Sequence, residues 1–141
     1  MGHRYWQVYT HLVWCTENRS NILRGELEKA AHAAMREVVR ELDMVPVCIN
    51  SAWNHTHALI SWNPSISIET AVEQMKEKAV NSWEEAKQDG DEQALRWQQG
   101  WAAFSVSPKL VDHVKWYIVN QKSLHRSGKI IERFEALKGE S

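Results

Sequence analysis

Hydrophobic and polar positions along the chain follow two different periods. Four segments are rich in aromatic and β-branched residues or alternate between apolar and polar ones, which predicts strands. They are residues 5–15, 46–52, 55–62 and 97–106. Three longer segments carry apolar residues at intervals of three and four, which predicts amphipathic helices. They are residues 23–42, 67–87 and 107–125.

The order of these elements is β-α-β-β-α-β-α. It predicts an α+β fold of ferredoxin-like or RRM-like type, an antiparallel sheet with helices on one face. The chain has no internal repeat and no linker, so we expect one domain over residues 1–141. The tail from Lys129 to Ser141 has Ile130, Ile131, Phe134 and Leu137 at helical spacing. We expect this tail to dock as a short helix or to pack on a partner subunit.

Composition narrows the class of protein. Hydrophobic residues make up 43% and charged residues 25%, an ordinary globular mixture. No apolar run approaches the ~20 residues that span a bilayer, and the N-terminus lacks the apolar core of a signal peptide. We therefore expect a cytoplasmic protein with no membrane partner. The formal net charge of -1 argues against a protein that coats duplex DNA by bulk electrostatics.

The third predicted strand begins with His55-Thr56-His57. Because strand side chains alternate, the two imidazoles share one face, while Thr56, Ala58 and Ile60 share the other. Two neutral imidazoles can ligate a divalent metal and leave positions open for substrate oxygens. The alternative is a pair of histidines that are merely hydrogen-bonded on a strand face. With 7 histidines in 141 residues, a His-x-His arises readily by chance.

The last predicted helix carries Tyr117 and Gln121 one turn apart on its apolar stripe. A tyrosine can attack a phosphodiester and form a covalent phosphotyrosine. An amide among aliphatic residues needs a partner, and a metal would give its carbonyl oxygen one. The alternatives are a core tyrosine and a solvated amide.

Several neighbours of Tyr117 are candidates for supporting roles. His125 flanks the stripe as an alternative ligand, and His113, one turn before Tyr117, is a possible catalytic helper. Trp116 points away from the stripe and could stack on an unpaired base. The basic residues of this helix predict a path for DNA phosphates, although a solvated face explains them equally well. The predicted DNA-binding residues are Lys115, Trp116, Lys122 and Arg126.

In this order, the motifs resemble those of the HUH single-tyrosine transposases, which include the REP-associated tyrosine transposases. The resemblance covers nearly the whole chain. It rests on four segments, which are residues 10–16, 54–61, 100–107 and 117–126. It implies that His55, His57 and Gln121 hold Mg²⁺ or Mn²⁺ and that Tyr117 is the nucleophile. It further implies a 5′-phosphotyrosine intermediate, recognition of single-stranded DNA hairpins, and a homodimer whose subunits share active sites.

Other functions remain open at this stage. The protein could be a domesticated relative acting on repeated extragenic palindromes. It could also be a non-catalytic module that binds single-stranded nucleic acid through exposed aromatic residues on its sheet. An unrelated metal-binding or structural dimer is a third alternative. Metal-dependent covalent attachment to DNA is expected of a transposase and of a domesticated relative. It is not expected of a binding module or of an unrelated dimer.

Overall fold

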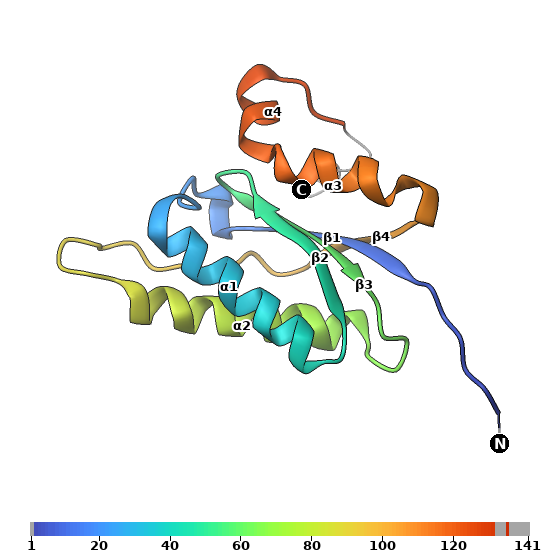
Figure 1. The fold of residues 1–141 in the computed structure, drawn as a ribbon. Helices are drawn as coiled ribbons and strands as arrows, with labels where there is room; N and C mark the ends of the chain where they lie inside the picture. Colours follow the sequence, from blue (N-terminus) through green and yellow to red (C-terminus); the bar gives the residue numbers. More distant parts are fainter. Residues whose placement is uncertain (1, 132–134, 136–141) are drawn as a thin grey trace.

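A computed structural model of the chain describes residues 2–131 and Glu135 (Figure 1). Its four strands form one antiparallel sheet in the order β2-β3-β1-β4. The strands are β1 (Tyr9–Cys15), β2 (Val45–Ser51), β3 (His55–Ser61) and β4 (Ala102–Val106). The helices are α1 (Gly25–Glu41), α2 (Ile68–Ala86), α3 (Val111–Val119) and α4 (Gln121–Ser127). Two short 3-10 turns, η1 (Glu17–Arg19) and η2 (Pro108–Leu110), complete the elements.

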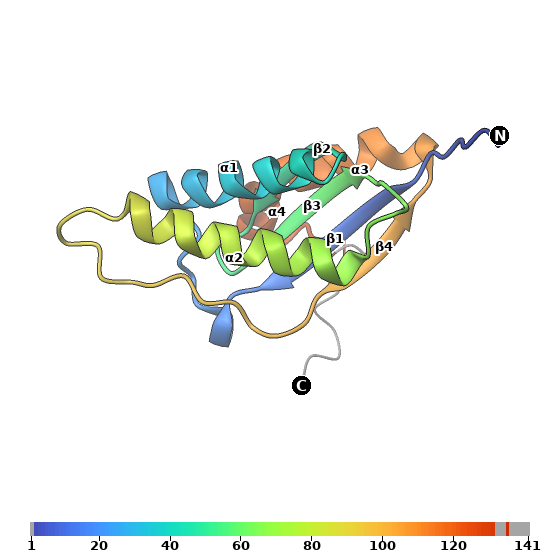
Figure 2. The same ribbon diagram turned by 90° about the horizontal axis from the view of Figure 1, so that it is seen from below.

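The predicted α+β fold is confirmed, including the predicted element order and the ferredoxin-like arrangement of strands. Helices α1 and α2 lie side by side on one face of the sheet, as Figures 1 and 2 both show. The two short helices α3 and α4 lie across the opposite face, so the expectation that all helices share one face is wrong for this last helical segment. The sheet is therefore covered on both faces, and β3 lies between the two layers of helices.

Alternation along β3 sets up two separate cores. Ala58 and Ile60 face α1 and α2 and join the main apolar cluster. Leu59 points the other way and packs with Val114 and Ile118 of α3. The face that carries Leu59 also carries His55 and His57, as the sequence pattern predicted. Consequently α3 and α4 cover the histidine pair.

Two predicted strands are shorter than expected. The first begins at Tyr9 rather than at residue 5, and residues 5–8 are exposed. The last begins at Ala102 rather than at Trp97, because Gly100 has a φ of 99°, which an extended strand does not allow. Trp97 makes only an isolated bridge to Thr16.

The predicted helix 107–125 is wrong in one respect, since it is broken at Asn120. Residue 120 has φ -99° and ψ 21°, which ends α3 and starts α4. The side chain of Asn50 on β2 donates hydrogen bonds of 3.0 Å to the carbonyl oxygens of Ile118 and Val119. These bonds satisfy carbonyl groups at the end of α3, so the helix can stop there.

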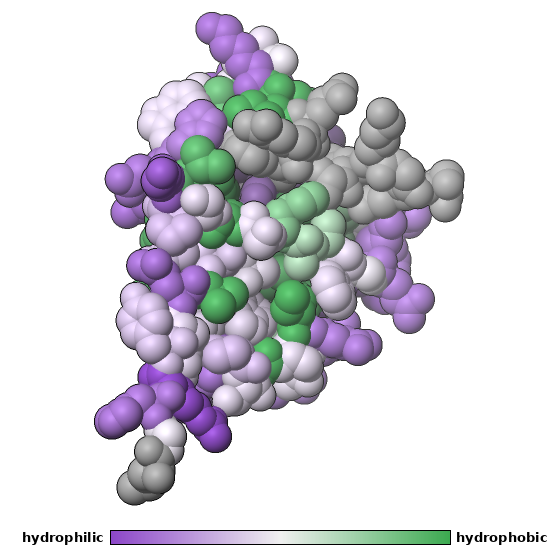
Figure 3. Space-filling view, turned by 90° about the vertical axis from the view of Figure 1, so that its right-hand side faces the viewer, coloured by the Kyte–Doolittle hydropathy of each residue, from purple (hydrophilic) through white to green (hydrophobic). Residues whose placement is uncertain are grey.

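Three further observations concern the surface, the helices and the tail. On the face shown in Figure 3, hydrophobic and hydrophilic residues are interspersed. Within the described ranges, none of the helices has the length and apolar content to cross a bilayer. The helical spacing predicted for the tail involves Phe134 and Leu137, which lie outside the described residues.

Candidate metal and tyrosine site

The histidine pair of β3 is buried under α3 and α4. His55 is 1% exposed and His57 is 0% exposed. In each ring Nδ1 is already engaged. Nδ1 of His55 lies 2.7 Å from Oδ1 of Asn54, and Nδ1 of His57 lies 2.8 Å from Nε2 of His11 on β1. These contacts fix the ring orientations, so both Nε2 atoms are directed at one point.

Helices α3 and α4 bring the predicted tyrosine and amide to the same place. Tyr117 and Gln121 are fully buried, and the Tyr117 ring meets the His57 ring edge-on at 6.1 Å. Gln121 donates to the carbonyl oxygen of Tyr117 at 3.2 Å. Its own carbonyl oxygen lies 3.1 Å from Nε2 of His125. The amide therefore links the nucleophile candidate to the histidine candidate across the helix break.

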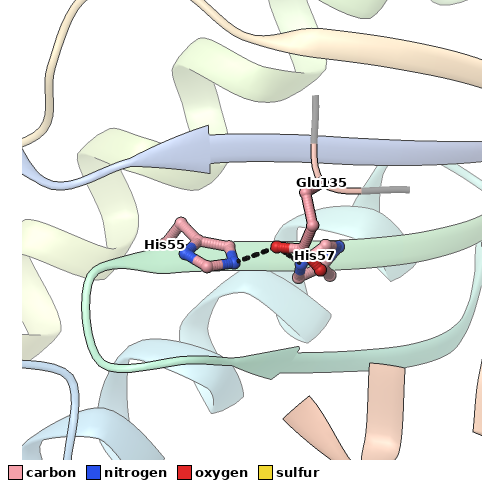
Figure 4. Close-up of side chains that lie close together, drawn as sticks. All are labelled: His55, His57 and Glu135. Carbon is pink, nitrogen blue, oxygen red and sulfur yellow. Dashed lines mark ion pairs between the residues drawn. The ribbon is translucent and has the colours of Figure 1, made fainter. Parts of the chain in front are cut away.

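Glu135, from the tail, completes the cluster, and the sequence analysis did not single it out. One carboxylate oxygen, Oε1, lies 2.7 Å from Nε2 of His55, 3.5 Å from Nε2 of His57 and 3.1 Å from Nε2 of His125. The other oxygen, Oε2, accepts a hydrogen bond from the hydroxyl of Tyr117. Figure 4 shows the two β3 histidines and Glu135 directed at one another. Glu132 and Glu140 stand in the same tail, so the sequence carried no signal that would single out Glu135 for this contact.

The donor set has the composition of a metal site. His55, His57 and Glu135 each offer one ligand atom, and these atoms lie within 4.8 Å of one another. Among the described residues, Nε2 of His55 and Nε2 of His57 make no hydrogen bond of normal geometry, although both are buried. Buried polar atoms rarely lack partners, so these two atoms fit a role as ligands. The chemistry of the residues present therefore fits a divalent cation.

Burial and neighbouring groups shift several pKa values here. Burial lowers the pKa of His57 to about 4 and that of His11 to about 3, so both rings are neutral at pH 7. Burial, together with the hydrogen bond to Glu135, raises the pKa of Tyr117 well above its usual range. Burial alone would raise the pKa of Glu135, but the nearby imidazoles of His125, His55 and His57 outweigh it and hold that pKa well below its usual range.

The remaining predicted residues lie around this cluster or apart from it. His113 and Lys115 are exposed on α3. Trp116 is 56% exposed, as predicted. Arg126 lies over the ring of Trp53, 5.7 Å from its centroid.

The side chain of Lys122 is directed toward α1 rather than toward the tyrosine. Its ammonium donates to the carboxylate of Glu28 and, at 3.1 Å, to the carbonyl oxygen of Ser51. These acceptors make Lys122 a link between α4 and α1. A phosphate contact would have to compete with both of them.

Together, the fold and the site define a ferredoxin-like domain with a buried His-His-Glu group beside a buried tyrosine. This chain belongs to the family of IS200-like transposases, whose family model matches residues 4–121. The resemblance to single-tyrosine transposases stated from the sequence is thus confirmed. Family membership makes the protein an enzyme of DNA transposition.

Two solved structures share the fold. One, from Deinococcus radiodurans R1 and assigned as a transposase, is 22% identical, with a TM-score of 0.65 over 86% of this chain and 97% of that chain. The other is a REP-associated tyrosine transposase bound to a REP hairpin. It is 14% identical, with a TM-score of 0.60 over 92% of this chain and 75% of that chain. No curated protein sequence matches the chain.

Proposed function

We propose that this protein cleaves and rejoins single-stranded DNA, with Tyr117 as the nucleophile and His55, His57 and Gln121 as ligands of Mg²⁺ or Mn²⁺. One observation carries the proposal. The hydroxyl of Tyr117 and Nε2 of His55 contact the two oxygens of the Glu135 carboxylate. Only this carboxylate therefore lies between the proposed nucleophile and a proposed metal ligand. Strand alternation and the broken helix bring them together although they are 62 positions apart in the sequence.

The reaction exchanges one phosphodiester for another. The oxygen of Tyr117 forms a bond to phosphorus while the bond between phosphorus and the 3′ oxygen breaks. The DNA then carries a 5′-phosphotyrosine link, and the 3′ oxygen gains the proton that the phenol gives up. Attack by another 3′ hydroxyl reverses these changes and joins the strands, so neither an oxidant nor an external energy source is needed.

Different residues of the site have different roles in this reaction. His55 and His57 are held in orientation by Asn54 and His11, and they present Nε2 to the cation. A bound Mg²⁺ or Mn²⁺ would neutralise charge on the scissile phosphate. Gln121 donates to the carbonyl oxygen of Tyr117, and its own carbonyl oxygen, which lies 3.1 Å from Nε2 of His125, is the atom that would complete the ligand set. Burial under α3 and α4 excludes water, which strengthens each of these electrostatic contacts.

The DNA partner is proposed by analogy with the hairpin-bound relative. We propose that this chain also recognises hairpin-forming single strands, and that exposed Trp116 lies where unpaired bases can stack. The homodimer with shared active sites and the cytoplasmic location stay predictions. So does the choice between a mobile element and a domesticated enzyme acting on repeated palindromes.

A covalent-adduct assay tests the proposed function. The protein is mixed with labelled hairpin DNA from the flanks of its gene and Mn²⁺, then run on a denaturing gel. We expect a shifted band that is absent with Tyr117→Phe and with EDTA, and present with the control Tyr9→Phe on β1. Binding on a native gel without any adduct would instead indicate a non-catalytic single-strand-binding module. A band that persists with Tyr117→Phe would assign the nucleophile elsewhere.

A further inference from the structure

The Glu135 carboxylate makes an unusual set of contacts for an acidic side chain near the C-terminus. It is only 3% exposed, and no basic lysine or arginine appears among its described contacts. Its neighbours are three imidazole nitrogens and a phenol. A buried carboxylate is costly unless cations or hydrogen-bond donors compensate its charge. The negative charge of the Glu135 carboxylate therefore needs a compensating group.

Proton positions on His55 give the first step. The amide oxygen of Asn54 only accepts hydrogen bonds, so the Nδ1 atom 2.7 Å away must carry the proton. In a neutral ring, Nε2 then presents a lone pair. This lone pair faces Oε1 of Glu135 at 2.7 Å. Two acceptors at this distance repel each other, so either a proton or a metal cation must lie between them.

The spacing of the ligand atoms gives the second step. Neighbouring ligands around an octahedral Mg²⁺ are about 3 Å apart, because each lies about 2.1 Å from the ion. Oε1 of Glu135 is 2.7 Å from Nε2 of His55 and 3.5 Å from Nε2 of His57. These separations bracket the value for ligands that share one ion.

Charge gives the third step. His55, His57 and Gln121 are neutral donors, and two of the three offer nitrogen. Mg²⁺ and Mn²⁺ prefer oxygen ligands, and carboxylates bind them best among protein side chains. A neutral set alone would hold such an ion weakly. A carboxylate supplies both the preferred atom and the missing negative charge.

We propose that Glu135 is a protein ligand of the divalent cation, bound through Oε1, and that Oε2 positions the hydroxyl of Tyr117 beside that cation. The proposal rests on the proposed function in one respect, since it concerns the cation assigned to His55 and His57. It adds a tail residue beyond the span matched by the family. Glu135 thereby contributes directly to the metal site.

A different role would also bring Glu135 to Tyr117. The tail could simply cover the nucleophile, because the backbone N–H of Ile131 also donates to the Tyr117 hydroxyl at 2.9 Å. A mere cover needs no metal ion, and a proton would then lie between His55 and Glu135. The two roles predict opposite effects of removing the carboxylate.

Calorimetric titration of the protein (residues 1–141) with Mn²⁺, without DNA, is the deciding experiment. We expect Glu135→Gln and Glu135→Ala to weaken Mn²⁺ binding by roughly tenfold or more. Glu135→Asp, which keeps a carboxylate, should fall between these variants and the wild type. Glu85→Gln, an exposed charge change on α2, should bind as the wild type does. Circular dichroism and thermal melting of each apoprotein identify any variant that does not fold.

The Mn²⁺ affinity of Glu135→Gln distinguishes a metal ligand from a cover. Unchanged Mn²⁺ affinity in Glu135→Gln overturns the proposal, and faster adduct formation in that variant would identify the tail as a cover. Loss of affinity in Glu135→Gln but not in Glu85→Gln supports it. Because the titration contains no DNA, it does not depend on the strand-transfer chemistry. Failure of the proposed function would appear instead as a missing adduct in the wild-type protein, whatever the Mn²⁺ result.

Discussion

Orientation of the histidine pair depends on single neighbouring side chains. His11 lies in the segment 10–16, to which the sequence assigned no role in the site, yet its Nε2 lies 2.8 Å from Nδ1 of His57 and the two rings stack with centroids 5.0 Å apart. Outer partners of this kind typically change metal affinity by about 10–100-fold when they are removed. We expect His11→Leu to weaken Mn²⁺ binding by about tenfold, measured calorimetrically. Binding of hairpin DNA in EDTA should not change. An unaltered Mn²⁺ affinity would show that packing alone orients His57.

Trp116 is the residue from which we expect a direct contribution to DNA binding. Its side chain is 56% exposed on α3, so truncation leaves the core intact. Stacking on an unpaired base contributes about 1–3 kcal/mol. Trp116→Ala should therefore weaken hairpin binding by roughly 5- to 150-fold with no shift in melting temperature. Val119→Ala, on the same helix and 53% exposed, is the matched control and should have little effect. Equal losses in both variants would indicate a general disturbance of α3.

At the level of single residues, the sequence predicted those parts of the site that follow a local period. His55 and His57 share a face because strands alternate, and Tyr117 and Gln121 share a side because helices turn. Glu135 could not be found in this way. It follows β3 by about 80 positions, beyond the Gly128 cap of α4, and nothing in its spacing ties it to a strand. Only the folded chain brings its carboxylate to the histidines.

Among the elements, the strands and the first two helices were predictable because each has its own apolar periodicity. The break at Asn120 was not, since the apolar stripe from Val114 to Leu124 continues through it without a change of period. The deciding interaction is tertiary. Asn50 on β2 binds the last carbonyl oxygens of α3, and sequence periodicity contains no information about that contact.

The link between α4 and α1 gives a prediction at this scale. Lys122 and Glu28 form an ion pair whose side chains are 26% and 12% exposed. Burial raises the pKa of Glu28, while the hydrogen bond from Lys122 opposes the shift. Lys122→Ala should lower the free energy of unfolding by about 1–3 kcal/mol, because it leaves a mostly buried carboxylate without its donor.

Urea unfolding of Lys122→Ala, Glu28→Gln and the double variant tests this link. If the two side chains act as a pair, the double variant should lose less stability than the sum of the single variants. Lys29→Ala, whose side chain is 74% exposed beside Glu26, is a control with little expected effect. A phosphate contact by Lys122 would give a different pattern. DNA binding would then weaken chiefly at low salt, with unchanged stability.

For the whole molecule, the near-neutral net charge limits how the protein can bind DNA. The net charge of -1 gives little general attraction to nucleic acid, so affinity must come from local contacts. The two layers of helices cover different faces of the sheet. Helices α1 and α2 bury the apolar face of the sheet, and α3 and α4 bury the polar face that carries the histidines.

Acid sensitivity of the whole fold follows from its buried histidines. Burial lowers the pKa of His32 to about 4, with Lys122 and Arg36 adding to the shift, from an ordinary value of 6.5. As pH falls below 6.5, the unfolded chain takes up a proton at His32 and the folded protein does not, so stability decreases down to about pH 4. His32 alone should cost about 2 kcal/mol between pH 7 and pH 5.

Urea unfolding of the wild type and His32→Gln at these two pH values measures that contribution. The glutamine variant should lose some stability at pH 7, since the imidazole Nε2 lies 2.7 Å from the hydroxyl oxygen of Ser51. Between pH 7 and pH 5, however, it should lose about 2 kcal/mol less than the wild type, because it has no proton to gain at this position. Parallel losses in both proteins would assign the acid sensitivity elsewhere. His57 is then the next residue to test, because burial lowers its pKa to about 4 as well.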